Sequence, residues 1–320
     1  MPHSLDADSK LGKTFQRGIG IFIALALFPW IFCFPLLALD NSAGKDAGLN
    51  IGIMSSFFSG VNTADALAAT KVWASAIVQK KGYAFTPQVA VFENTNAAVQ
   101  AAKENRLDLL VSLSNEFWAI KNLVEMDPYF IASRHGRAED EILLLAHRRS
   151  PIQKLDELEG KSILLSSVIG LSIGKIWLEN LVMEKGFDSL DSFSRNTSIT
   201  AKDSSAVLPV FFHKADACLI VSSGFDIITE MNPQLRNDLK IIVQSPPLVI
   251  AVISVRKSYG RDMKESLLDS LEDLHSDPKG QQILMLFKTE RLVPFDKTYL
   301  TKVGQLIAEH ERLEKQTKAR

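Results

Sequence analysis

The stretch SILLSSVIGLSIGKIWLENL, residues 162–181, decides how the rest of the chain is interpreted. An apolar run at 163–165 leads into a turn rich in serine and glycine. Apolar residues then recur with helical spacing at Ile176, Trp177 and Leu181. Short apolar runs are typical of strands, and a period near 3.6 residues is typical of helices, so the stretch predicts a strand, a loop and a helix.

One chemistry that uses such a loop is serine hydrolysis. Residues 170–174 spell G-x-S-x-G, the turn that exposes a nucleophilic serine in α/β-hydrolases, and here that serine is Ser172. A catalytic triad also needs a later acid, which Asp216 or Asp226 could supply, and a later histidine. The later histidines lie among charged residues, where a solvated imidazole is the usual state, and they are His213, His275 and His310. The hydrolase therefore stays the less favoured alternative.

Two further chemistries bind phosphate or another anion. A Walker A loop needs four residues between its glycines and a hydroxyl after its lysine, but three residues intervene here and Ile176 follows Lys175. An anion site at a helix N-terminus requires fewer specific residues than a Walker A loop, because the free N–H groups and the helix dipole already favour an anion. The hydroxyls of Ser166, Ser167 and Ser172 can add donors. The competing interpretation is that Ser172 only caps the helix, since serine is a common N-cap residue.

Composition indicates a globular chain that is long enough for two modest domains. Of its 320 residues 46% are hydrophobic, and 36 Lys+Arg against 37 Asp+Glu leave a formal net charge of −1. No overall field therefore attracts nucleic acid. The histidines are scattered singly and no Cys, His, Asp and Glu cluster has metal-ligand spacing, so we predict neither a metal nor another cofactor.

The N-terminal segment predicts export. Three basic residues precede an uncharged apolar run at 18–39, which fits a signal peptide or a single membrane anchor. Cleavage is favoured and an anchor in the inner membrane stays open; both place the remaining chain in the periplasm. If residues 1–39 are removed, Cys218 is the only cysteine left, so no intrachain disulfide can form, and we expect a buried, apolar strand residue there.

Short apolar runs alternate with helix-period segments from Leu49 onward, which is typical of a mostly parallel sheet covered by helices. Two turns, SRHGRAEDE at 133–141 and QSPPLV at 244–249, are candidates for crossings between two lobes. The first is interpreted as a solvated hinge, with a binding role for its basic residues as the alternative. The expected strands are 49–55, 88–93, 107–113, 141–148, 162–167, 217–223, 240–245 and 248–256.

Several segments together resemble one family. They are SPIQKLDELEGKSILLSS at 150–167, NRLDLLVSLSNEFW at 105–118, HKADACLIVSSGFDIITEM at 213–231 and SDPKGQQILMLFKTERLVPFDKTYL at 276–300. In order and spacing they are similar to the phosphonate/phosphate-type solute-binding proteins that serve ABC transporters. The resemblance covers roughly residues 49–311.

The resemblance implies a two-lobed α/β periplasmic-binding fold, with a mostly parallel sheet in each lobe and two hinge strands between them. The expected divisions are 1–39 for the signal peptide or anchor, 48–145 for lobe 1 with 252–320 returning to it, and 146–251 for lobe 2.

The expected ligand site follows from loops at the carboxyl ends of strands, where α/β sheets bind ligands. Relatives that bind phosphonates carry hydroxyls after the first strand of lobe 2, whereas Ile169 and Leu171 stand there in this chain. If Glu116 faces the cleft, an amine-bearing ligand is favoured. The predicted ligand-binding residues are Ser55, Ser56, Thr95, Asn96, Ser114, Asn115, Ser166, Ser167, Ser172 and Ser222.

These observations predict a monomeric solute-binding protein that does no chemistry. It would close by a hinge motion on a small polar ligand, an oxyanion or a phosphonate-like compound, and present it to an ABC permease. The alternative within the same fold is a membrane-tethered sensor or accessory protein that reports the ligand to a membrane partner.

Overall fold

The computed structural model describes residues 48–167 and 171–319. By internal contacts the chain divides into two units, 1–42 and 43–320, and all described residues belong to the second. The predicted signal peptide or anchor at 1–39 therefore lies outside the described residues, as does Gly170 of the G-x-S-x-G match. Along the described part of the chain, no helix has both the length and the apolar character required to cross a membrane.

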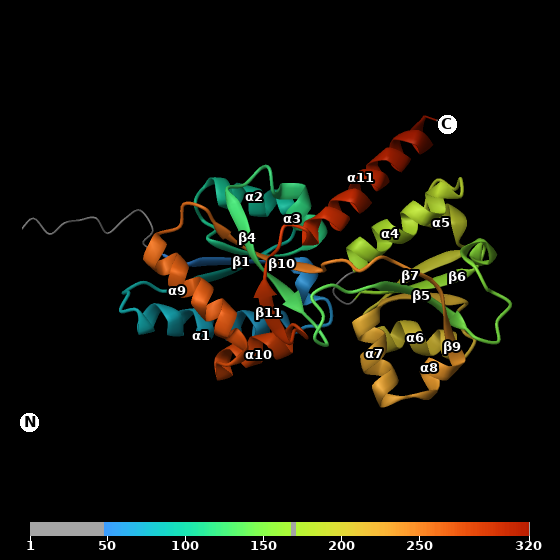
Figure 1. Cartoon of the computed structure of the whole chain (residues 1–320), viewed down its shortest axis with the longest axis horizontal. Coiled ribbons are helices and arrows are strands. Elements are labelled where there is room, and N and C mark those ends of the chain that lie inside the picture. Colours follow the sequence, from blue (N-terminus) through green and yellow to red (C-terminus); the bar gives the residue numbers. More distant parts are fainter. Residues whose placement is uncertain (1–47, 168–170, 320) are drawn as a thin grey trace, which may run out of the picture. The chain divides into compact units, whose positions relative to one another are not determined.

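Six strands form the sheet of lobe 1, in the order β11-β4-β10-β3-β1-β2 (Figure 1). Strand β1 pairs in parallel with β2 and β3, whereas β10 is antiparallel to β3 and to β4, and β11 is antiparallel to β4. These strands are β1 (Asn50–Met54), β2 (Gln88–Phe92), β3 (Leu109–Leu113), β4 (Met126–Ser133), β10 (Ala251–Arg256) and β11 (Arg291–Pro294).

Five strands form the sheet of lobe 2, in the order β7-β6-β8-β5-β9. Strand β6 is parallel to β7 and β8, and β5 runs antiparallel to β8 and β9. These strands are β5 (Ile142–His147), β6 (Ser162–Ser166), β7 (Asn196–Thr200), β8 (Ala217–Val221) and β9 (Leu239–Gln244).

Helices cover both faces of each sheet (Figure 1). Lobe 1 carries α1 (Thr63–Lys80), α2 (Thr95–Lys103), α3 (Ser114–Ile120), α9 (Arg261–Glu272) and α10 (Pro278–Leu286), with 3-10 turns η1 (Ser55–Phe58) and η3 (Asp273–His275). Lobe 2 carries α4 (Leu171–Glu184), α5 (Leu190–Phe193), α6 (Asp203–Phe211), α7 (Ser222–Met231), α8 (Gln234–Asp238) and the 3-10 turn η2 (Leu155–Leu158). The last helix, α11 (Tyr299–Lys318), follows β11.

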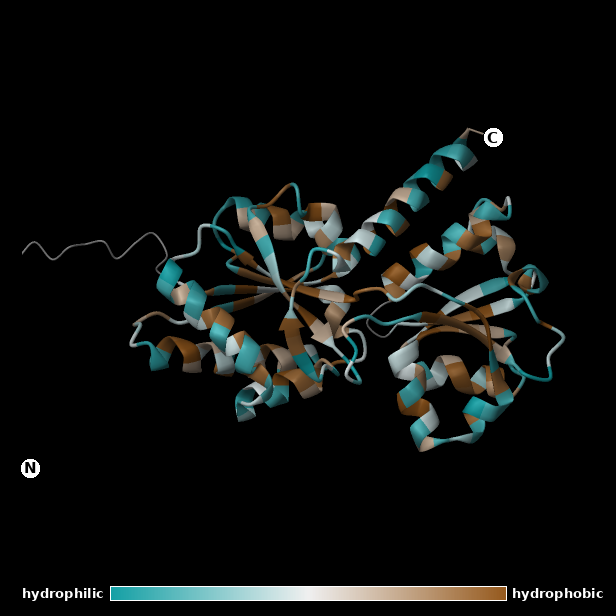
Figure 2. Cartoon of the chain, viewed as in Figure 1, coloured by the Kyte–Doolittle hydropathy of each residue, from teal (hydrophilic) through white to brown (hydrophobic). Residues whose placement is uncertain are grey.

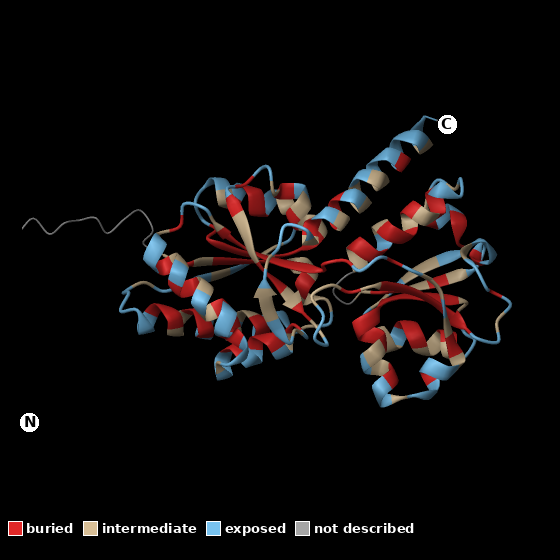
Figure 3. Cartoon of the chain, viewed as in Figure 1, coloured by how far each residue is buried: buried red, intermediate tan, exposed pale blue. Residues whose placement is uncertain are grey.

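Strand β5 is apolar on both faces, which suits the centre of the lobe 2 sheet. Every residue of β5 is buried, as expected for a strand covered on both faces (Figure 3). Leu143 and Leu145 belong to the core cluster formed with α6, α7 and α8, whereas Ile142 and Leu144 belong to the cluster that contains residues of α4. Alternate side chains therefore support helices on opposite faces, and Figure 2 shows the resulting apolar strands between partly polar helices.

Two segments cross between the lobes, one after β4 and one before β10. The backbones of Asp140 and Leu248 exchange two hydrogen bonds of 2.8 Å, so the two crossings form an isolated antiparallel bridge. The expected boundary at residue 145 falls inside β5, which pairs within the sheet of lobe 2. The first crossing therefore lies at 134–141 and the second at 245–250, because β5 and β10 start where the chain enters each sheet.

All eight expected strands are present to within a few residues, and both sheets are mixed rather than mostly parallel. In each sheet the strand that arrives from the other lobe, β5 or β10, runs against its neighbours. Three strands were not expected from the sequence: β4, β7 and β11. Strand β4 contains Pro128, which pairs with Ser254 at a shift in register, where a missing N–H is tolerated.

The sole cysteine after residue 39, Cys218, is fully buried in β8, as expected for a small apolar strand residue. Burial and the neighbouring Asp203 carboxylate raise the pKa of its thiol well above the usual range. The thiol is therefore held in its neutral, unreactive form.

Candidate functional site

Hydroxyl and amide side chains at the strand ends join the two lobes directly. The Ser59 hydroxyl of lobe 1 donates to Ser167 of lobe 2 at 2.8 Å. The Ser172 hydroxyl, on α4 of lobe 2, donates to the Asn115 Oδ1 atom of α3 at 3.0 Å. Three of the predicted site residues, Asn115, Ser167 and Ser172, therefore take part in hydrogen bonds across the lobes.

The other predicted residues of lobe 1 mostly serve local structure. Ser55 donates to the Glu93 carbonyl at 3.4 Å, and Ser56 donates to the Glu116 carboxylate at 3.1 Å. The Ser114 hydroxyl is buried at the start of α3 and has no hydrogen-bond partner among the described atoms. Thr95 and Asn96 begin α2, whose N-cap is the preceding residue, Asn94.

Glu116 also has a structural role, because one of its carboxylate oxygens accepts two hydrogen bonds within lobe 1. Its carboxylate accepts the Leu113 N–H at 2.8 Å, at the N-terminus of α3. Burial raises the pKa of Glu116, and the hydrogen bonds from Leu113 and Ser56 partly offset that effect. The carboxylate therefore caps α3, where negative charge is favoured.

Two predicted serines of lobe 2 donate to carboxylates, of which Asp140 is buried and Asp203 half-buried. Ser166, at the end of β6, donates to Asp203 at the start of α6. Ser222, at the start of α7, donates to Asp140 at 2.6 Å, and the Ser223 N–H donates to the same carboxylate at 3.1 Å. Asp140 lies on the first crossing, so the N-terminus of α7 already has an anion from the hinge.

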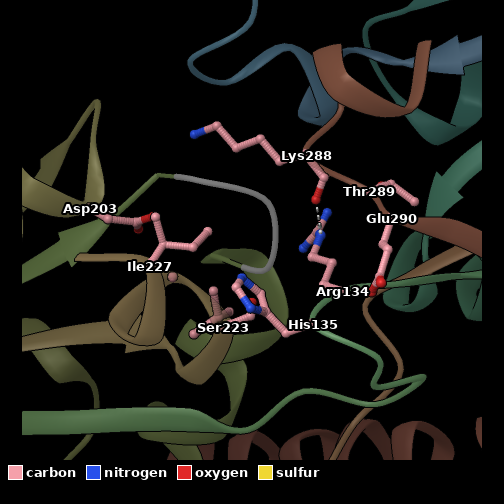
Figure 4. Close-up of a pocket in the computed structure, with 10 residues that line it drawn as sticks. Arg134, His135, Asp203, Ser223, Ile227, Lys288, Thr289 and Glu290 are labelled. Carbon is pink, nitrogen blue, oxygen red and sulfur yellow. Dashed lines mark hydrogen bonds between the residues drawn. The ribbon is translucent and has the colours of Figure 1, made fainter. Parts of the chain in front are cut away.

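A cavity of about 410 Å³ lies between the lobes beside this hinge (Figure 4). Lobe 1 and the first crossing contribute one part of its wall, and α6, α7 and β8 of lobe 2 contribute the other. Its lining residues are Arg134, His135, Asp203, Val221, Ser223, Gly224, Ile227, Lys288, Thr289 and Glu290.

A tight hairpin places Arg134 in the cavity wall. His135 and Gly136 have φ of 48° and 69°, and the backbones of Arg134 and Arg137 exchange two hydrogen bonds of 2.9 Å. Two successive residues with positive φ are typical of a two-residue hairpin turn, and glycine adopts that region without strain. The turn sends Arg137 to Asp226 of α7, at 2.6 Å, and leaves Arg134 beside the cavity.

The Arg134 guanidinium is only partly satisfied by the protein. Its Nε atom donates to the Lys288 carbonyl at 3.1 Å, as drawn in Figure 4. Its Nη2 atom is buried and has no hydrogen-bond partner among the described atoms. Burial lowers the pKa of Arg134, while the carboxylates of Asp140 and Asp203 act in the opposite direction. A buried cationic donor without a partner is costly, so this atom is well placed to bind an anion.

Asp203 faces the same cavity from lobe 2. Burial raises the pKa of its carboxyl, and the hydrogen bond from Ser166 and the charges of Lys288 and Arg134 partly offset that effect. The carboxylate lies so close to Gly224 that a Cβ atom there would be 2.8 Å from its Oδ2 atom. Glycine at 224 therefore lets Asp203 approach the first turn of α7.

The C-terminal helix α11 also joins the lobes, since it packs against α3 of lobe 1 and α4 of lobe 2. The buried Asn180 of α4 donates to the Leu306 carbonyl at 3.0 Å, and its Oδ1 atom is 2.7 Å from His310 Nδ1. Lys302 Nζ lies 3.1 Å from the carboxylate of Glu139 on the first crossing. The described lobes therefore contact each other at the strand ends, at the hinge and along α11.

No triad forms around Ser172 within residues 48–167 and 171–319. Its hydroxyl is bonded to Asn115, the His213 ring lies 3.8 Å from that of His147 between centroids, and His310 contacts Asn180. His275 lies 3.1 Å from the Glu272 carbonyl in η3. In the same part of the chain no group of three His, Cys, Asp or Glu residues could hold a metal ion.

Sequence reasoning considered Arg134 only as an alternative and missed Asp203, Lys288 and Glu290. The signal for the hairpin was available, because His135-Gly136 between two arginines fits a two-residue turn. Lys288 and Glu290 carry no such signal: they lie about 154 residues from the hairpin in sequence and reach it only through the pairing of β11 with β4.

Two sheets, two crossings and a cavity beside the hinge define the class of a two-lobed substrate-binding protein. Residues 57–300 match the family described as the periplasmic substrate-binding protein of the phosphonate ABC transporter, and the chain belongs to that family. It is therefore a periplasmic-type solute-binding component of an ABC transporter. No curated protein matches the chain by sequence.

Solved structures show the same fold at low sequence identity. A Xanthomonas citri protein bound to ATP has a TM-score of 0.61 at 19% identity, with 84% of this chain and 98% of that chain covered. A binding protein component of an ABC phosphonate transporter from Pseudomonas aeruginosa has a TM-score of 0.59 at 14% identity, with 84% and 88% covered. PhnD1 from Prochlorococcus marinus, in complex with methylphosphonate, has a TM-score of 0.58 at 14% identity, with 83% and 98% covered.

Proposed function

We propose that the chain captures a small oxyanion, of the phosphonate or phosphate type, in the cavity beside the hinge and presents it to an ABC permease. The observation that carries this proposal is the buried Arg134 Nη2 atom, a cationic donor without a partner at the cavity wall. A charged hydrogen bond from a guanidinium to an oxyanion is among the strong ones, and the cavity shields it from water.

A further donor lies nearby. Lys288 lines the cavity and adds positive charge. The cavity volume of about 410 Å³ is within the range of small-molecule sites. Family membership and the methylphosphonate complex of PhnD1 favour phosphonates among the oxyanions.

The ten residues predicted from the strand ends fit this function in a different way. Asn115 and Ser172, like Ser59 and Ser167, act as contacts that hold the lobes closed, and Ser166 positions Asp203. Release of the solute then requires these bonds to break while the Asp140–Leu248 bridge serves as the hinge.

The proposed function also includes export from the cytoplasm, a monomeric state and the absence of catalysis. Residues 1–39 direct the chain out of the cytoplasm, as a signal peptide or as an anchor, and the exported part works as a monomer. It binds its solute without converting it.

A thermal-shift screen of the purified chain tests the proposal. A ligand that binds only the folded state stabilises it by about 2.7 kcal/mol at 100 times its Kd, which raises the Tm by several degrees for a protein of this size. Methylphosphonate or phosphate should raise the Tm of the wild type and not that of Arg134→Met. Equal shifts in both proteins would place the anion elsewhere, and no shift with any oxyanion would contradict the proposal.

A further inference from the structure

Lobe 1 contains a second cavity, of about 70 Å³, which the proposed function leaves unused. Ile53, Val111 and Ile253 of the sheet line it, together with residues of α1, α9 and α10. Apart from two threonines, its lining is apolar or aromatic. Protein interiors have few voids larger than a water molecule, and an empty apolar void lowers stability. A retained void of this size therefore calls for an occupant.

The lining of this cavity favours an apolar occupant. The hydroxyl of Thr70 donates to the Ala66 carbonyl at 2.8 Å. The hydroxyl of Thr289 donates to the Phe287 carbonyl at 3.2 Å. Both hydroxyls already have partners, so a polar occupant would lose its hydrogen bonds to water without replacing them. An apolar cavity of roughly 150 Å³ binds benzene, so about half that volume holds a chain of about two to three carbons.

The apolar cavity adjoins the cavity beside the hinge, because Thr289 lines both. Thr289 directly follows Lys288, whose carbonyl accepts the Arg134 Nε–H at 3.1 Å, and Figure 4 shows Lys288 and Thr289 beside Arg134. The apolar space therefore begins at the residue next to the contact that positions the guanidinium. A solute whose oxyanion is bound by Arg134 can extend a short alkyl group past Thr289 into lobe 1.

We propose that this cavity binds the alkyl tail of the captured oxyanion, so that short-chain alkylphosphonates are preferred over methylphosphonate and inorganic phosphate. The inference rests on the oxyanion site proposed above. The phosphonate oxygens accept hydrogen bonds from Arg134, while the tail fills the void in lobe 1. A tail of about three to four carbons fits, because the first carbon passes Thr289 and the others occupy the cavity. Burial of each added CH₂ group tightens binding about four-fold.

Isothermal titration of the full chain with n-alkylphosphonates of increasing length tests this inference. Butylphosphonate should bind at least about ten-fold tighter than methylphosphonate, and longer chains should gain nothing more because the cavity is full. The matched control solute is 3-hydroxypropylphosphonate, which has the length of butylphosphonate and should lose most of the gain because its end is polar. Equal affinities for methylphosphonate and butylphosphonate would overturn the tail cavity and leave the oxyanion site standing. Failure of every phosphonate to bind would overturn the oxyanion site, and this inference with it.

Two variants of the cavity wall locate the tail. Ala132→Leu adds a branched side chain to the wall and should reduce the preference for butylphosphonate over methylphosphonate to below about three-fold. Ile283→Val removes one CH₂ group from the wall, a mild change in a core, and should move the preferred tail length up by about one carbon. The control is Ala119→Leu, at an exposed position on α3, which should keep the wild-type dependence on chain length. An unchanged dependence in both wall variants would place the tail outside this cavity and overturn the proposal.

Discussion

Two polar regions lie between the lobes, and they differ in whether their groups already have partners. At the strand ends, the neutral side chains of Ser59, Ser167, Asn115 and Ser172 bond to each other across the lobes. Beside the hinge, the charged Arg134 has a buried N–H group without a partner. A ligand gains most from donors that the protein leaves unsatisfied, so unmet bonding capacity marks a binding site better than polarity does.

Removal of the Arg134 guanidinium should have the largest effect on binding. Arg134→Met keeps much of the side-chain volume and removes a charged donor worth about 1.5–3 kcal/mol, so affinity for methylphosphonate should fall roughly 10- to 100-fold. Isothermal titration measures it. Arg137→Met, in the same hairpin but paired with Asp226, is the matched control and should change affinity less than three-fold. Equal losses in both variants would assign the effect to the hairpin instead of the cavity.

An effect of similar size, on stability and not on binding, is expected at the serines of α7, whose hydroxyls already have a partner. Asp140→Ala removes the acceptor of Ser222 and Ser223 at the hinge and leaves buried donors without partners. Each such group costs about 1–3 kcal/mol, so the free energy of unfolding should fall by about 3 kcal/mol. Denaturant titration measures the loss, with the neighbouring Glu141→Ala as the control. A loss below about 1 kcal/mol would show that water replaces the carboxylate easily.

The charged groups beside the hinge should lower the stability of the folded state. The pH dependence of the Tm of an Asp203 variant tests this. Burial raises the pKa of Asp203, so the folded state holds the proton more firmly than the unfolded chain. That contribution is fully present below the unfolded pKa of about 3.9 and is lost as the pH rises through the folded pKa. Asp203→Asn should therefore have a higher Tm than the wild type at neutral pH, and the difference should shrink toward pH 4. A lower Tm for the variant at pH 7 would contradict this.

The smallest effect is expected at the strand ends. Ser172→Ala removes one partly buried hydrogen bond to Asn115, worth about 0.5–1.5 kcal/mol, and affects closure more than the anion contact itself. Affinity for methylphosphonate should fall less than about ten-fold, and less than in Arg134→Met. If the order were reversed, with Ser172→Ala the more damaging change, the strand ends would be the binding site and the comparison above would fail.

Local sequence patterns predicted much of the fold because their physics is local. The eight expected strands were apolar runs bounded by turn residues, and all eight form. Strand β4 was missed because Pro128 interrupts its pattern, and its pairing with β10 tolerates the proline only at a register shift. The boundary at 145 was misplaced because sequence does not show which of two sheets a buried strand such as β5 joins.

The sequence by itself determined the alternation of strands and helices, the two crossing segments and the hydroxyl-rich strand ends, since each depends on residues close together in the chain. Only the tertiary structure decided which polar groups are free. Ser172 and Ser222 look equally available in sequence, yet Asn115 and Asp140 occupy them. The role proposed for Arg134 depends on Asp203 and Lys288, which are far away in the chain and line the same cavity, and such a juxtaposition is set by packing alone.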